Sequence, residues 1–110
     1  MTDDSLQTAE SLRDIVAVDR LLHEPARMVI SAILYAVDSA DFLYLLRETG
    51  LTKGNLSSHL SKLEKAGYVA IEKTYAGKIP RTICRMTGEG RTAFDRYRDQ
   101  LKRAADSLPL

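Results

Sequence analysis

The segment TKGNLSSHLSKLEKAGYV, residues 52–69, carries the start and stop signals of a single helix. Thr52 is a good N-cap because its hydroxyl can accept a hydrogen bond from a backbone N–H two or three residues later. Gly67 suits the left-handed conformation that often ends a helix. At 100° per residue, three leucines fall within about 60° of one another and form a narrow apolar stripe. We therefore predict a helix over residues 52–66 that is anchored by Leu56, Leu60 and Leu63.

The opposite side of this helix is small and polar near its start and basic near its end. Its members are Gly54, Ser58, Ser61, Lys62 and Lys65, with Asn55, Ser57 and His59 on its flanks. Short polar side chains let a helix backbone approach DNA base edges, asparagine can pair with adenine, and lysine neutralises phosphate. The alternative is that the serines are merely tolerated on a solvated surface.

A basic hairpin is expected directly after this helix. Residues 68–74 and 81–86 are short β-prone runs, and residues 75–80 between them contain the turn signals glycine and proline. Three basic side chains, Lys73, Lys78 and Arg81, surround the tip, and a narrow DNA minor groove attracts such cations. Because this hairpin follows the helix, DNA binding explains the small polar face better than a solvated surface that merely tolerates serines.

The rest of the chain is predicted to be helical, so the fold class is mainly α with one small hairpin. We expect helices over residues 5–22, 25–37 and 42–49, a turn over residues 37–40, and a last helix over residues 88–106 capped by Thr87. The pair 42–49 and 52–66 has helix–turn–helix spacing. The last helix carries a stripe of Phe94, Tyr97, Leu101, Ala104 and Leu108.

Length and charge are consistent with one DNA-binding domain over residues 1–110. Residues 1–51 hold four basic and nine acidic side chains, net −5, whereas residues 52–91 hold eight basic and three acidic, net +5. Such asymmetry suggests that the second half binds a polyanion. No apolar run approaches the ~20 residues of a membrane span, and the acidic N-terminus has no signal core, so we expect a cytoplasmic protein without a membrane partner.

The run TKGNLSSHLSKLEKAGYVAIEKTYAGKIPRTICRMTGEGRTAF, together with HEPARMVISAIL and DFLYLLRETGLTKGNLSSHL, resembles the winged-helix DNA-binding domain of small prokaryotic transcriptional regulators of the MarR and ArsR types. The resemblance covers residues 21–97. It implies a homodimer that binds a nearly palindromic duplex site, with residues 52–66 as a recognition helix in the major groove. Residues 73–81 would then be the wing, on the backbone or in the minor groove.

The resemblance also assigns site residues one by one. It implies Lys53, Asn55, Ser57, Ser58, His59 and Lys62 in the recognition helix and Lys78 and Arg81 in the wing, and their charge adds Lys65 and Lys73 to the expected DNA-binding set. This sequence departs from the family at Ile79, where a second basic residue is frequent. A compact winged helix already closes around residues 25–90, so we expect residues 5–22 and 88–106 to pair with a second subunit.

Several alternatives stay open at this point. The chain could be a winged-helix protein-interaction module that never binds DNA, or a regulator gated by a small molecule at the dimer interface. His23, His59 and Cys84 form no cluster with metal-ligand spacing, so neither a metal nor another cofactor is expected. Cys84 could serve as a redox switch only with an exposed sulfur and a low thiol pKa. No nucleotide-binding or catalytic motif is present, so no enzyme activity is expected.

Overall fold

The computed structural model describes residue 13 and residues 18–109. In chain order their elements are α2 (Pro25–Ala36), β1 (Ala40–Asp41), α3 (Phe42–Thr49), α4 (Lys53–Lys65), β2 (Val69–Ala76), β3 (Ile79–Met86) and α5 (Gly88–Ser107). The three strands form an antiparallel sheet in the order β1-β3-β2. The helix expected over residues 5–22 lies mostly outside the described residues. Arg13 is helical, but residues 20–22 form turns, so the prediction that the helix reaches Leu22 is wrong.

Helix α2, Pro25–Ala36, is the centre of the core. Glu24 caps it, since its carboxylate accepts hydrogen bonds from the backbone N–H of Ala26 at 3.1 Å and of Arg27 at 2.9 Å. Pro25 fits the first turn, where a missing N–H costs nothing. Ile30 and Leu34 are fully buried.

The helix–turn–helix pair follows the predicted bounds closely. Helix α3 spans Phe42–Thr49 and ends at Gly50, whose φ of 69° is left-handed. Helix α4 spans Lys53–Lys65, and the hydroxyl of Thr52 accepts the backbone N–H of Asn55 at 3.1 Å. The predicted apolar stripe of α4 is confirmed, because Leu56, Leu60 and Leu63 are all buried in the core.

The hairpin is longer and its turn tighter than expected. Strand β2 spans Val69–Ala76 and β3 spans Ile79–Met86, which leaves only Gly77 and Lys78 as the loop. The expected turn over residues 75–80 is therefore wrong. Gly77 has the positive φ, 65°, that such a tight turn needs. Pro80 pairs with Tyr75 at the second position from the loop, where the backbone N of a two-residue hairpin points away from its partner strand.

A third strand was not expected. Strand β1, Ala40–Asp41, pairs with β3 at Cys84 and Ile83, so the turn expected over residues 37–40 is wrong at its last residue. Two residues are too few to create a periodic pattern in the sequence. Their pairing fixes the start of α3 against the sheet.

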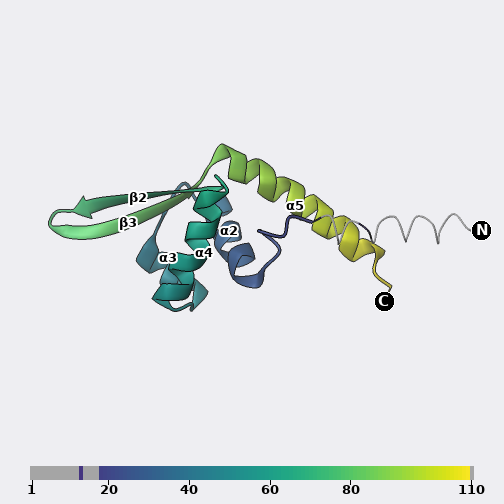
Figure 1. Cartoon of the computed structure of the whole chain (residues 1–110), viewed down its shortest axis with the longest axis horizontal. Coiled ribbons are helices and arrows are strands. Elements are labelled where there is room, and N and C mark those ends of the chain that lie inside the picture. The colour runs from purple at the N-terminus through teal and green to yellow at the C-terminus, as the bar shows by residue number, and fades with distance from the viewer. Residues whose placement is uncertain (1–12, 14–17, 110) are drawn as a thin grey trace, which may run out of the picture.

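The last helix, α5, spans Gly88–Ser107 and begins at the predicted cap, where the Thr87 hydroxyl accepts the N–H of Gly90 at 2.9 Å. Tyr97 and Ala104 are buried, Phe94 and Leu101 are part-buried, and Leu108 just beyond the helix is 48% exposed. The hairpin and α5 extend from opposite ends of the body formed by α2, α3 and α4 (Figure 1). In the described part of the chain, no helix is long and apolar enough to cross a membrane.

Candidate nucleic-acid interface

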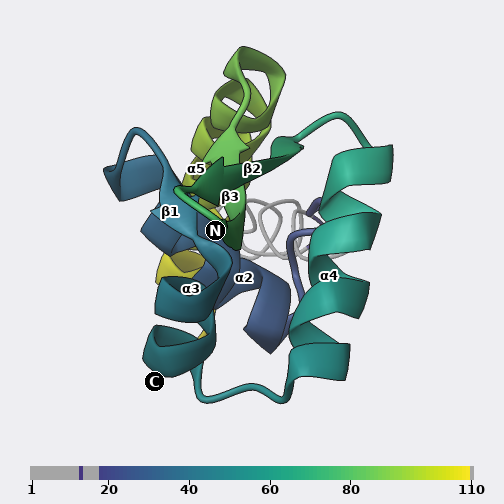
Figure 2. The ribbon, with the colours of Figure 1, turned by 90° about the vertical axis from the view of Figure 1, so that its left-hand side faces the viewer.

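The solvent-facing side of α4 collects most of the residues expected to bind DNA. We call it the α4 face, and its members, all exposed, are Lys53, Asn55, Ser57, Ser58, Lys62 and Lys65. The leucine stripe holds the other side of α4 in the core, so the α4 face has a fixed orientation. In the view along the hairpin, α4 lies on one side of it and α3 on the other, with the hairpin projecting forward (Figure 2).

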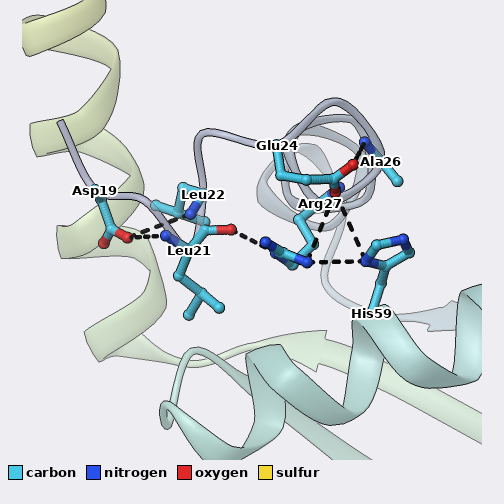
Figure 3. Close-up of polar contacts among 7 residues, drawn as sticks. All are labelled: Asp19, Leu21, Leu22, Glu24, Ala26, Arg27 and His59. Atoms are coloured by element: carbon cyan, nitrogen blue, oxygen red, sulfur yellow. Dashed lines mark hydrogen bonds and ion pairs between the residues drawn. The ribbon is translucent and has the colours of Figure 1, made fainter. Parts of the chain in front are cut away.

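His59 is not a full member of the α4 face, because its ring points toward the start of α2 (Figure 3). Its Nδ1 lies 3.0 Å from Nη1 of Arg27 and 3.6 Å from Oε2 of Glu24, and its side chain is only 20% exposed. Since arginine can only donate, Nδ1 accepts in this contact and the ring proton is on Nε2. His59 therefore connects α4 to α2.

Arg27 and Glu24 extend this connection to the segment before α2. Arg27 donates from Nε to the carbonyl of Leu21 at 2.6 Å, and its side chain is 12% exposed. Partial burial acts to raise the pKa of Glu24, but hydrogen bonds from the Arg27 and Ala26 backbone N–H groups, with the nearby charge of Arg27, hold that pKa below its usual value. No local sequence pattern predicts this cluster, because His59 and Arg27 are 32 residues apart.

The same segment is also held at the far end of α4. Asp19 accepts the backbone N–H groups of Leu21 and Leu22 through Oδ1 (Figure 3), and its Oδ2 accepts the hydroxyl of Tyr68 at 2.8 Å. Burial, and then the hydrogen bond to Asp19, raise the pKa of Tyr68 to about 12. Tyr68 follows α4 directly and donates its N–H to Leu63. Residues 19–22 are thus linked to the middle of α4 through Arg27 and His59, and to its end through Tyr68.

The three wing cations do not share one surface. Arg81 binds Asp41 with Nη2 at 2.7 Å and Nε at 2.9 Å, both to the same carboxylate oxygen. This hydrogen bonding is the main reason that the pKa of Asp41 lies below its usual value, and the N–H of Leu43 adds to it. Lys78 lies in the turn, and Lys73 lies on β2 opposite Thr82. Successive positions alternate between faces, so Lys73 and Arg81 project from opposite faces of the hairpin.

A hollow of about 530 Å³ separates α4 from the hairpin. It is lined by Phe42, Ser57, Leu60, Ser61, Glu64, Ile71, Lys73 and Thr82. Ser57 and Lys73 were expected at the site, whereas Thr82 was not, because only the hairpin register reveals that it lies beside Lys73. The hollow joins the α4 face to one face of the hairpin, and its polar lining consists of three hydroxyls, the ammonium group of Lys73 and the carboxylate of Glu64.

Cys84 lies away from this surface and is fully buried in β3. Burial is the main reason that the pKa of its thiol rises to about 11. A thiol with these properties is a poor nucleophile at neutral pH, which argues against a redox role. Among residue 13 and residues 18–109, no group of three or more histidine, cysteine, aspartate or glutamate side chains could hold a metal ion.

A helix–turn–helix followed by a β-hairpin is the arrangement of a winged-helix domain, and comparison with known proteins supports this class. Residues 26–105 match the family described as the winged helix DNA-binding domain. The chain belongs to this family. Regulators of the MarR, ArsR and PadR families share its fold, so the resemblance seen in the sequence is confirmed.

Three relatives illustrate the similarity. A transcriptional regulator homologue from Pyrococcus horikoshii is 34% identical, with a TM-score of 0.82 over 92% of this chain and 99% of that one. An uncharacterised protein of Methanocaldococcus jannaschii is 37% identical over 78 residues, which are 71% of this chain and 85% of the relative. A MarR family regulator from Silicibacter pomeroyi is 25% identical, with a TM-score of 0.62 over 96% of this chain and 69% of that one.

Proposed function

We propose that this chain is a homodimeric, sequence-specific transcriptional regulator of the cytoplasm that binds double-stranded DNA. Helix α4 enters the major groove, and the wing contacts the backbone or the minor groove. The observation that carries the proposal is the α4 face, whose small polar and basic side chains are exposed while the leucines behind them are buried. The proposal assigns the chain no enzyme activity.

Affinity and specificity would come from different residues. Five exposed lysines can neutralise phosphates: Lys53, Lys62 and Lys65 on α4, and Lys73 and Lys78 in the wing. Such contacts are largely independent of DNA sequence. Asn55, Ser57 and Ser58 are short enough to reach base edges without holding the helix away from the groove. His59 would position α4 through Arg27 rather than contact a base.

Dimerisation through the terminal helices is part of the proposal. Apolar side chains follow α5 from Phe94 to Ala104, and Leu108, just beyond the helix, exposes nearly half its surface. Helix α5 extends away from the body (Figure 1). A two-fold dimer would present two α4 helices about 34 Å apart, one turn of DNA. Leu108→Glu should raise the dimer dissociation constant in sedimentation analysis. Lys102→Glu, an exposed change on the same helix, should not.

The experiment that tests DNA binding starts by selecting bound fragments from random duplexes. Binding to a selected duplex is then measured by fluorescence anisotropy over a range of salt. We expect Lys62→Ala to weaken binding to every duplex and to lower the salt slope by about one. The matched control is Lys102→Ala, which removes the same charge from α5. Asn55→Ala should instead change the preferred base at one position, by roughly tenfold in affinity.

A protein-interaction module is the alternative outcome of the same experiment. If the parent chain binds no duplex at low salt, the DNA-binding proposal fails. If it binds but Lys62→Ala and Lys102→Ala have the same salt slope, the docking through α4 fails.

A further inference from the structure

The tip of the wing exposes two large apolar side chains that DNA binding through lysine and arginine does not explain. Tyr75 is 70% exposed and Ile79 is 68% exposed, the highest values among the large apolar side chains of the described residues. They flank the two-residue loop, Tyr75 on β2 and Ile79 on β3. We call residues 75–80 the wing tip.

In this structure the arginine of the wing points away from the tip. Arg81 is held by two hydrogen bonds to Asp41, at 2.7 and 2.9 Å, which direct its guanidinium back toward the start of α3. Arg81 lies two residues behind Ile79, about 7 Å along the strand. The wing tip therefore contains one cation, Lys78, between two apolar side chains.

The register places these apolar side chains on opposite faces. Tyr75 pairs with Pro80, and Ile79 pairs with Ala76 at the next position, and adjacent pairs in a hairpin project to opposite sides. A surface that docks flat against a protein would gather its apolar groups on one face. A tip that enters a groove is contacted by both walls of the groove. The apolar side chains on opposite faces of the wing tip match insertion into a groove.

We propose that the wing tip inserts into the DNA minor groove with Tyr75 and Ile79 as an apolar wedge, Tyr75 on the side of α4 and Ile79 on the side of α3. This inference rests on the proposed function and adds a specificity-determining pair to it. We expect the wing tip to bind DNA for two reasons. Tyr75 lies on the same face of the hairpin as Lys73 and the hollow beside α4. In addition, no acidic residue occurs between Lys73 and Arg81. Apolar wedges in the minor groove partly unstack base steps and bend the duplex.

The wedge predicts a preference that an inserted arginine would not give. Arginine favours narrow A-tract minor grooves, whereas a wedge favours the flexible TA and CA/TG steps, which bend at low cost. Selected sites should therefore carry such steps where the wing lies, outside the bases read by α4.

The test uses the full chain and a selected duplex with donor and acceptor dyes at its two ends. The single variants Tyr75→Ser and Ile79→Ser should each lower affinity roughly tenfold, with the salt slope unchanged because no charge is lost. They should also reduce the DNA bend seen as energy transfer. Tyr75→Phe should behave like the parent. Lys78→Ala is the contrast, since it should lower the salt slope by about one.

A stability effect is separated from a contact effect by thermal unfolding and by a further variant. Ile79→Lys, at an exposed position, should raise the salt slope by about one while still reducing the bend. Parent-like bending and affinity in both serine variants would overturn the wedge and leave the proposed function standing. A parent chain that binds no duplex would overturn both.

Discussion

Asp41 has two separable tasks, and replacing it by asparagine or alanine should distinguish them. Its Oδ1 caps α3 by accepting the N–H of Leu43 at 2.7 Å, and its Oδ2 binds Arg81. Asparagine is as good a cap as aspartate but carries no charge. Alanine removes both the cap and the charge. The difference between the two variants therefore measures the cap alone.

The expected magnitudes follow from exposure. Losing the cap costs about 1 kcal/mol. Losing the ion pair costs only about 0.5 kcal/mol, because the Arg81 side chain is 46% exposed and water screens the attraction. Asp41→Ala should thus lower the free energy of unfolding by about 1.5 kcal/mol and Asp41→Asn by about 0.5 kcal/mol. In a domain of this size these values correspond to roughly 6 °C and 2 °C in melting temperature.

The pH dependence gives an independent check by urea unfolding. The pKa of Asp41 is lower in the folded chain than in the unfolded chain, so its charge stabilises the fold above about pH 4 and that stabilisation is lost as pH falls through the folded pKa. The gap between parent and Asp41→Asn should close in this acid range. Equal losses for the asparagine and alanine variants at pH 7 would refute the cap, and a gap unchanged at pH 3 would refute the ion pair.

Three further changes test other parts of the fold. Thr52→Ala should lower the free energy of unfolding in urea by about 1 kcal/mol, while Thr52→Ser keeps the cap of α4. Gly90→Ala should lower the melting temperature, at a cost of about 1–3 kcal/mol, because a Cβ there would meet the backbone carbonyl of Tyr68; Gly88→Ala, with open space, should not. Cys84 should resist iodoacetamide at pH 8, as followed by mass spectrometry, until the chain is unfolded, since it is buried and its pKa is raised to about 11.

The helices were predictable because their signals are local. Helix α3 has the predicted bounds and α4 differs from them by one residue at each end, since Thr52 and Gly50 act within a few positions of the helices that they limit. Strand β1 was missed because two residues carry no periodic pattern. The wing turn was misjudged because Gly77 and Pro80 both signal a turn, and only the register shows that Pro80 fits a strand.

The candidate site was predictable in composition but less so in arrangement. The exposed lysines and Asn55 follow from the helical period and the buried leucines. The partners of His59 and Arg81 lie 32 and 40 residues away, and no local pattern contains such distances. Only the folded chain reveals that His59 connects α4 to α2 and that Arg81 connects the wing to the start of α3.

Pro80 affects how readily separate copies of the protein associate through the hairpin. Strand β1 covers β3 only at Ile83 and Cys84, so the rest of that edge, toward the tip, has no neighbouring strand among the described residues. Unpaired edges of this kind invite hydrogen bonding between copies of a protein and hence aggregation. Proline supplies no N–H there, and its backbone nitrogen is on the open side. Pro80 thus makes the open edge of β3 a poorer template for a strand from another copy at high protein concentration.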